Sequence, residues 1–256
     1  MTMDEPGVSR WDGSDLRCED CSYNVLLSDG RCLAGRCCAQ DAYALRIDRF
    51  VRENPEFAVE LLGHPYFEVR AIAARYVAPE RLAWMMRDPD ETVRSVVALR
   101  IPQKLLGRLA KDPHREVRIR VATRVDGREL LDMADDSDYF VRVLVARRLP
   151  TSMLGLMMDD SDREVRRTVA SRLPPDELPV MCVDVDPGVR VEAARRLPVG
   201  WLGRLCEDPD WRVRYEVALR LDKKRLGPMR DDPDELVREI VCNRLAEDEH
   251  TWLETA

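Results

Sequence analysis

Hydrophobic residues return along most of the chain in a fixed pattern with a period of 24 residues. In the repeat that covers residues 88–111, Val93, Val97 and Ile101 have the spacing of one buried helix face. Pro102 cannot continue that helix, so only about nine residues remain for the second part of the repeat. The pattern therefore predicts one full helix and one short helix, of α or 3₁₀ type, in each repeat.

A Val-Arg pair occurs at the same position of every repeat, with no insertion or deletion between the first pair and the last. The pairs are Val69-Arg70, Val93-Arg94, Val117-Arg118, Val141-Arg142, Val165-Arg166, Val189-Arg190, Val213-Arg214 and Val237-Arg238. These pairs indicate an array of about eight repeats. An aspartate opens each repeat except the first, where His64 takes its place. Asp88, followed by Pro89 and two acids, predicts the N-cap and first turn of a helix.

The arginine of each Val-Arg pair is predicted to point inward. On a helical wheel Arg94 lies between Ile101 and Ala98, inside the face that does not vary among the repeats. A buried guanidinium without a partner would cost several kcal/mol. We therefore predict that each of these arginines forms a two-point ion pair with an opening aspartate of its own or an adjoining repeat.

The overall charge limits the classes of partner. A net charge of -7 argues against a general surface for nucleic acid or anionic membranes. The sequence has no long apolar run and no signal sequence, so we expect a soluble, cytoplasmic protein without membrane association. The first fifteen or so residues lack periodicity and are expected to be loose.

Five of the eight cysteines lie in one short segment with the spacing C-x₂-C-x₁₀-C-x₄-C-C. Cys18 and Cys21 are spaced to bind one metal centre from a single turn. A turn then returns the chain, so that Cys32 and either Cys37 or Cys38 can complete four ligands. Four thiolates suit a zinc site or an iron–sulfur cluster, and the spacing alone slightly favours zinc.

The residues after the cysteines predict a connection to the array. Residues 41–53 have the pattern of a capped amphipathic helix, with Ile47 and Phe50 on its apolar face. No Gly/Ser-rich linker follows. We therefore expect residues 1–54 to form a small metal-binding cap, docked on a repeat array that covers residues 55–256.

Other candidate sites are weak. Cys182 and Cys206 occupy equivalent places in adjoining repeats, and Cys242 replaces an alanine, so all three are interpreted as core residues. The sequence has no arrangement typical of a nucleophilic or phosphate-binding site. No enzymatic activity is expected.

The chain resembles the leucine-rich repeat variant family known from nitrogen-fixing bacteria. The resemblance covers nearly the whole chain and rests on the 24-residue unit with D-P-x-x-x-V-R and L-P-x-x-x-L. It also rests on the N-terminal C-x₂-C…C-x-x-G-x-x-C segment, followed by Asp48-Arg49-Phe50 and Asn54-Pro55-Glu56. The resemblance implies an all-α fold, a right-handed superhelical solenoid of α and 3₁₀ helices in two layers without strands.

The resemblance also implies a [4Fe-4S] cluster on the N-terminal segment, and the zinc that the spacing favours stays the alternative cofactor. The family pattern C-x-x-G-x-x-C falls on Cys32 and Cys38, so Cys18, Cys21, Cys32 and Cys38 are the expected ligands. Cys37 departs from the pattern. It is either a bystander or the fourth ligand through a one-residue slip.

Three functions follow as hypotheses. The leading one is an iron–sulfur scaffold that binds an unknown protein partner through the variable positions of its repeats and responds to redox changes. The alternative is an electron-transfer protein that docks a redox protein through its solenoid. A third, a DNA-binding solenoid, would need a basic concave face, which the acidic balance argues against.

Overall fold

The structure is a computed structural model that describes residues 7–251, with side chains described for residues 7–246. It divides into two compact units, Met1–Glu129 and Leu130–Ala256. Apart from two isolated β-bridges, the described residues form only helices, turns and loops. The predicted all-α repeat fold is thereby confirmed, whereas the domain boundary after residue 54 stays a prediction.

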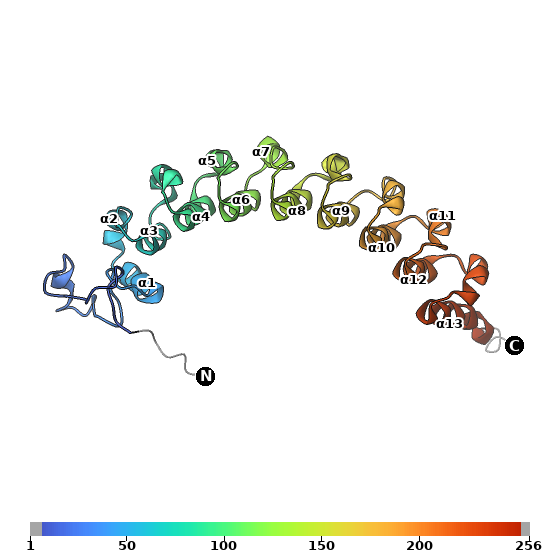
Figure 1. Cartoon of the computed structure of the whole chain (residues 1–256), viewed down its shortest axis with the longest axis horizontal. Helices are drawn as coiled ribbons and strands as arrows, with labels where there is room; N and C mark the ends of the chain where they lie inside the picture. Colours follow the sequence, from blue (N-terminus) through green and yellow to red (C-terminus); the bar gives the residue numbers. More distant parts are fainter. Residues whose placement is uncertain (1–6, 252–256) are drawn as a thin grey trace. The chain divides into compact units, whose positions relative to one another are not determined.

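The first unit holds the cysteine-rich segment and the leading repeats (Figure 1). Its elements are η1 (Asn24–Leu26), α1 (Ala44–Glu53), η2 (Pro55–Phe57), α2 (Ala58–Leu61), α3 (Phe67–Ala73), η3 (Pro79–Arg81), η4 (Ala83–Arg87), α4 (Glu91–Arg100), α5 (Gln103–Leu106), η5 (Gly107–Leu109) and α6 (Arg115–Ala122), followed by α7 (Gly127–Leu131), in which the division falls. The longer helices pack side by side in one layer, α1 on α3, α3 on α4 and α4 on α6. The short helices form the other layer.

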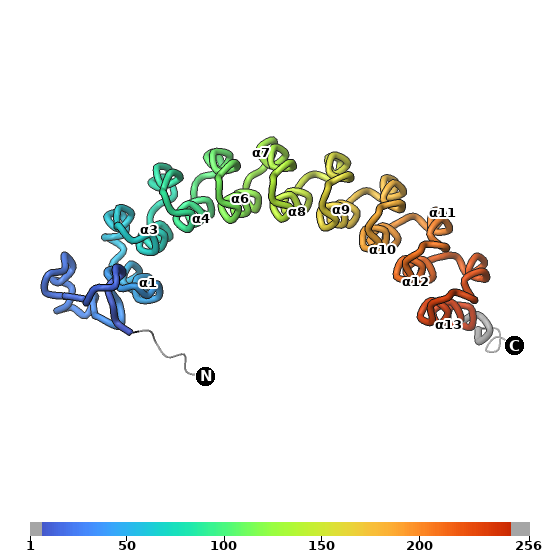
Figure 2. The backbone as a smooth tube through the Cα atoms, viewed as in Figure 1, coloured from blue at the N-terminus to red at the C-terminus, as the bar shows by residue number. Residues whose placement is uncertain are grey.

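The second unit repeats the same two layers. Its elements are α8 (Tyr139–Arg148), η6 (Thr151–Met157), α9 (Arg163–Ala170), η7 (Leu178–Val183), α10 (Pro187–Arg196), α11 (Val199–Leu202), η8 (Gly203–Leu205), α12 (Trp211–Arg220), η9 (Lys223–Arg225), η10 (Gly227–Asp231) and α13 (Glu235–Thr251). Helices α8, α9, α10, α12 and α13 pack in succession. Figure 2 shows that the backbone of each unit makes one loop per repeat, as the 24-residue period predicts.

The helix of each repeat begins two residues later than the sequence analysis predicts. Asp90 is the N-cap of α4, and its side chain accepts the N–H of Thr92 at 2.8 Å. Asp88 instead accepts the N–H of Asp90 at 2.9 Å and forms an ion pair with Arg70. The same caps in the second unit are Asp138, Asp162, Asp186 and Asp210. The prediction of Asp88 as N-cap is wrong because its carboxylate forms a turn and holds an arginine.

Six of the Val-Arg arginines form the predicted two-point ion pair with the opening aspartate of the next repeat. In one such pair, Arg142 Nε and Nη2 each lie 2.8 Å from an oxygen of Asp160. Arg142 Nη1 also donates to the carbonyl of Asp136 at 2.8 Å. No arginine of these pairs is more than 12% exposed, so the inward orientation is confirmed. The pairs are Arg70–Asp88, Arg94–Asp112, Arg142–Asp160, Arg166–Asp184, Arg190–Asp208 and Arg214–Asp232.

The other two Val-Arg arginines have the same bond to the backbone. Arg118 Nη1 donates to the carbonyl of Asp112 at 2.9 Å, and Arg238 Nη1 donates to that of Asp232 at 2.6 Å. For these two arginines, the ion pair with an opening aspartate of their own or an adjoining repeat stays a prediction.

A second arginine column, which the sequence analysis did not single out, joins the other ends of the helices. Arg172 Nη1 donates to the carbonyls of Ala146 and Leu149, at 2.6 and 2.9 Å. These carbonyls end helix α8 and have no partner within it. Equivalent bonds are made by Arg100, Arg124, Arg196, Arg220 and Arg244. Each repeat is therefore linked to a neighbour within its unit by a guanidinium at both ends of its helix.

The three cysteines of the array are not all core residues. Cys182 is 9% exposed and Cys206 is half-buried. Cys242 is exposed, although the alanine in the same place of the preceding repeat, Ala218, is fully buried. The core prediction for Cys242 is wrong because α13 is the last described helix, and no later described helix covers that face.

Candidate metal centre

The cysteine-rich segment packs on the first helices through an aromatic cluster. The ring centroid of Tyr23 lies 5.0 Å from that of Phe50 on α1 and 5.2 Å from that of Phe57 on η2. The Tyr23 hydroxyl donates to Glu60 at 3.1 Å. The Asn54 side chain, fully buried, donates to the carbonyl of Arg31 at 2.9 Å. Helix α1 thus contacts both the cysteine-rich segment, through Phe50, and helix α3 of the array.

Two glycines shape the loops that carry the later cysteines. Gly30 has φ of 68° and ends a turn in which its N–H donates to the carbonyl of Leu27 at 3.1 Å. Gly35 has φ of 79°, and a β-carbon there would lie 3.2 Å from a methyl of Val8. Side chains other than glycine rarely adopt such φ values. The turn predicted between Cys21 and Cys32 is present.

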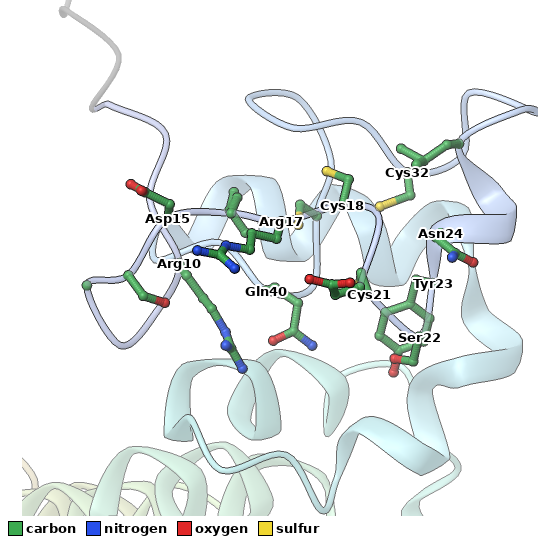
Figure 3. A pocket seen from close by; sticks show the side chains of 16 residues that line it. Arg10, Asp15, Arg17, Cys18, Cys21, Ser22, Tyr23, Asn24, Cys32 and Gln40 are labelled. Carbon is green, nitrogen blue, oxygen red and sulfur yellow. The ribbon is translucent and has the colours of Figure 1, made fainter.

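Four of the five clustered cysteines line one pocket, which has a volume of about 800 Å³ and is partly open to solvent (Figure 3). Cys18 and Cys21 are half-buried, whereas Cys32 and Cys38 are buried. Figure 3 shows the side chains of Cys18 and Cys32 on different segments of the loop, both directed into this pocket. The sequence therefore folds so that Cys18, Cys21, Cys32 and Cys38 come together.

Cys37 does not line this pocket. Its side chain is fully buried, and its Sγ donates to the carbonyl of Arg31 at 3.6 Å. Burial, together with the nearby Glu53 carboxylate, raises the pKa of the Cys37 thiol. An isolated bridge between Leu33 and Cys37 fixes this residue, so that Cys37 and Cys38 face different surroundings.

The sulfur atoms in the pocket interact with each other and with peptide N–H groups. A hydrogen bond with Cys38 raises the pKa of Cys32, and burial raises it further. The same hydrogen bond lowers the pKa of Cys38, with help from the N–H groups of Gln40 and Asp41. Burial raises the pKa of Cys21, against the effect of the Tyr23 N–H. Because metals bind the thiolate form, these N–H groups favour the state that binds.

Residues near the start of the chain also build the site. The N–H of Trp11 donates to the carbonyl of Gln40 at 3.0 Å, and its ring stacks on Tyr66 with centroids 5.8 Å apart. Arg10, which lines the pocket, forms an isolated β-bridge with Asp41. The expectation that the first fifteen residues are loose is wrong for residues 9–14, because Trp11 anchors them. Residues 1–6 lie outside the described part of the chain.

The donor set fits an iron–sulfur cluster. A four-iron cluster needs four thiolate ligands, one for each iron. Four cysteines around one pocket, with peptide N–H groups facing two of the sulfurs, supply that arrangement.

Sequence reasoning missed several residues of the site. The buried pair of Asp41 and Arg46, with Nη1 and Oδ2 3.3 Å apart, is one of them. The sequence predicts a capped helix from residue 41, but α1 begins at Ala44, and the Asp41 side chain accepts the N–H of Tyr43. Trp11 is another, since a single aromatic residue in a polar stretch gives little signal. The 18-residue spacing of the Arg–Asp ion pairs in the repeats could not reveal a pair only five residues apart.

The comparisons with known proteins agree with this geometry. Residues 8–60 match the family model described as LRV protein FeS4 cluster, and residues 187–210 match the model of the leucine-rich repeat variant. A solved structure titled "A leucine-rich repeat variant with a novel repetitive protein structural motif" is 43% identical, with a TM-score of 0.86. The match covers 90% of this chain and 99% of that one.

A curated relative matches over a shorter stretch. It is an "Uncharacterized 27.7 kDa protein in nifB 3'region" of Rhodobacter capsulatus, 48% identical over 80 residues. The match spans 31% of this chain and about a third of that relative. The cluster model identifies the cofactor as a [4Fe-4S] cluster rather than the zinc considered above. By its repeats, its fold and its cysteine-rich segment, the chain belongs to the leucine-rich repeat variant family.

Proposed function

We propose that the chain is a non-catalytic scaffold that binds a protein partner through the long-helix layer of its second unit. The observation that carries this proposal is a groove of about 450 Å³ on that layer. It is lined by residues of α9, α10, α12 and α13, among them Trp211, Tyr215 and Leu236. Tryptophan, tyrosine and arginine are the residues that most often dominate binding energy at protein interfaces.

The chemistry of the groove defines the kind of partner it fits. Trp211 and Leu236 are 39% and 48% exposed, so apolar surface is available for an inserted side chain. Arg167 lines the same groove and is exposed. The expected partner is therefore a protein segment that inserts an apolar side chain beside Trp211 and directs a carboxylate to Arg167.

This proposal is tested with one pair of matched tryptophan variants. A partner captured by cross-linking in cells is purified, and its affinity is measured by calorimetry. We expect Trp211→Ala to weaken binding by about tenfold or more. Trp84→Ala is the control, because Trp84 is 59% exposed and lies on the short-helix layer of the first unit. Equal affinities for the wild type and Trp211→Ala would contradict the proposal.

We further propose that Cys18, Cys21, Cys32 and Cys38 bind the [4Fe-4S] cluster, each sulfur holding one iron. The support is that these four side chains line one pocket and Cys37 does not. The cluster supplies one-electron redox chemistry. The protein residues position it, exclude part of the solvent and direct N–H groups at the sulfurs.

Electron transfer is the second candidate function, favoured by the partly open pocket and the half-buried Cys18 and Cys21. In this case the chain would dock a redox protein, and the bound cluster would supply the one-electron chemistry. Redox titration with dithionite, followed by electron paramagnetic resonance, tests it. Reversible reduction is the expected result, and a cluster that dithionite does not reduce would contradict electron transfer.

A further inference from the structure

A buried ion pair lies directly behind one of the proposed ligands. Asp41 is fully buried and Arg46 is 3% exposed, with Arg46 Nη1 3.3 Å from Asp41 Oδ2. The pair differs from those of the repeats, in which the arginine and aspartate are 18 residues apart. Asp41 follows Cys38 by only three residues. A charge at this depth is poorly screened by solvent.

The pair contacts Cys38 from both of its members. The carbonyl of Arg46 accepts the backbone N–H of Cys38 at 3.1 Å. The N–H of Asp41 faces the Cys38 sulfur, and the carboxylate of the same residue, three positions after Cys38, is near enough to act on that sulfur.

Other bonds hold the Asp41 side chain in one orientation. Asp41 Oδ1 accepts the N–H of Tyr43 at 2.8 Å, and the guanidinium of Arg46 lies over the Tyr43 ring. Arg46 Nη1 also donates to the carbonyl of Gly7 at 3.2 Å. The negative charge is therefore fixed near Cys38 and cannot turn away when the charge of the pocket changes.

We propose that Asp41, held by Arg46, is a positioning residue that lowers the reduction potential of the cluster through Cys38. This inference rests on the proposed ligand set. Reduction adds one electron to the centre that Cys38 binds, and a fixed carboxylate nearby disfavours that added negative charge. Arg46 opposes the effect, because its positive charge favours the added electron.

The test compares midpoint potentials of the full chain, purified without oxygen and titrated with dithionite under electron paramagnetic resonance. Asp41→Asn keeps the shape of the side chain and removes its charge. We expect a more positive midpoint than in the wild type, at the same iron and sulfide content. The double variant Asp41→Asn/Arg46→Gln is expected to show a smaller positive shift, because the opposing charge is also removed.

The control is Asp232→Asn, which removes a buried carboxylate from the second unit. It is expected to lower stability and leave the midpoint unchanged. A purely structural role for Asp41 predicts lower stability or less cluster, with an unchanged midpoint.

An unchanged or more negative midpoint in either Asp41 variant would overturn the inference. If Asp41→Asn alone loses the cluster, the double variant is measured in its place. A more positive midpoint potential than in the wild type then supports the inference, and an unchanged or more negative one overturns it. A wild-type chain that binds no iron and sulfide would instead overturn the proposed ligand set.

Discussion

At the scale of single residues, the fold depends on guanidinium groups that are buried and neutralised. Each two-point ion pair satisfies both oxygens of an aspartate, and the same arginine donates to a backbone carbonyl, as Arg142 does with Asp160 and Asp136. Removing one member of such a pair leaves the other charge buried without a partner. Loss of either partner therefore destabilises the fold, even where the intact pair itself contributes little net stability.

Replacing a paired arginine by lysine should destabilise the protein. Arg142→Lys keeps the charge but cannot form two parallel bonds with Asp160. We expect the free energy of unfolding to fall by about 1.5–3 kcal/mol, measured by urea denaturation. Arg163→Lys is the control, since Arg163 is 68% exposed and its ion pairs are 3.7 Å or longer. An unchanged stability of Arg142→Lys would refute the buried pair.

The same pairs predict how stability depends on pH. The Arg214 guanidinium holds the pKa of Asp232 below its usual value of 3.8. Because the unfolded chain then binds more protons, this contribution is complete above pH 3.8 and is lost as pH falls through the lower pKa of the folded state.

Denaturation measured from neutral to acidic pH should therefore show a fall in stability below pH 3.8 that is shallower in Asp232→Asn. A variant with the same acid dependence as the wild type would contradict this assignment.

Cys37 and Cys38 offer a matched pair of neighbouring residues. We expect Cys37→Ser to keep the iron content and visible absorbance of the wild type, because Cys37 bonds to Arg31 outside the pocket. Cys38→Ser should lose both. Loss of iron and absorbance in Cys37→Ser but not in Cys38→Ser would show that Cys37 is the fourth ligand.

At the scale of helices, arginines form hydrogen bonds between neighbouring repeats at both ends of each long helix. The Val-Arg arginines act at the helix N-terminus, and the column that contains Arg172 acts at the C-terminus. A cation at the C-terminal end also interacts favourably with the helix dipole. The register between neighbouring repeats in a unit is thus fixed by directional bonds in addition to apolar contacts.

Removing an arginine that bonds to the C-terminal carbonyls of the preceding helix should lower the local stability of that helix. Arg172→Met loses the bonds to Ala146 and Leu149, so the last turn of α8 should exchange its amide hydrogens faster. We expect the unfolding free energy to fall by about 1–3 kcal/mol. Arg167→Met, at an exposed position of the same repeat, should change neither quantity by a comparable amount.

The sequence predicts the helices of the repeats well, because a position that keeps its residue type in many repeats stands out from chance. The full helix, its end before Pro102 and the short second element all follow from apolar spacing and proline. The sequence does not distinguish the N-cap Asp90 from Asp88, because two aspartates flank Pro89 and nothing in the pattern shows which one pairs with an arginine. The column of Arg172 does carry a signal, since arginine recurs there every 24 residues.

The candidate site was harder to predict because it occurs once. The cysteine spacing and the family resemblance named four residues that do line one pocket. The contribution of Trp11 and of the Asp41–Arg46 pair depends on contacts between distant segments, such as the bond from Trp11 to Gln40. No periodic pattern reports such contacts.

At the scale of the whole molecule, repeats interact mainly with their sequence neighbours. Stability in such an array is close to a sum of local terms. The cluster segment contacts the first helices through Tyr23, Phe50 and Phe57. None of the helices described between residues 7 and 251 combines the length and apolar character needed to span a membrane.

Loss of the cluster should therefore have a local effect. In Cys18→Ser, we expect faster amide exchange within residues 8–60 and unchanged exchange within residues 187–210. Hydrogen exchange followed by mass spectrometry measures both regions in one experiment. A uniform increase across the chain would show that the array depends on the cluster throughout its length.

The redox chemistry proposed for this protein depends on a [4Fe-4S] cluster bound by Cys18, Cys21, Cys32 and Cys38. The most direct measurement is the iron, sulfide and zinc content of the chain purified without oxygen, for the wild type and for Cys18→Ser. We expect about four iron and about four sulfide per wild-type chain, with both largely lost in the variant. A wild-type chain that holds a single zinc ion and no sulfide would contradict this expectation.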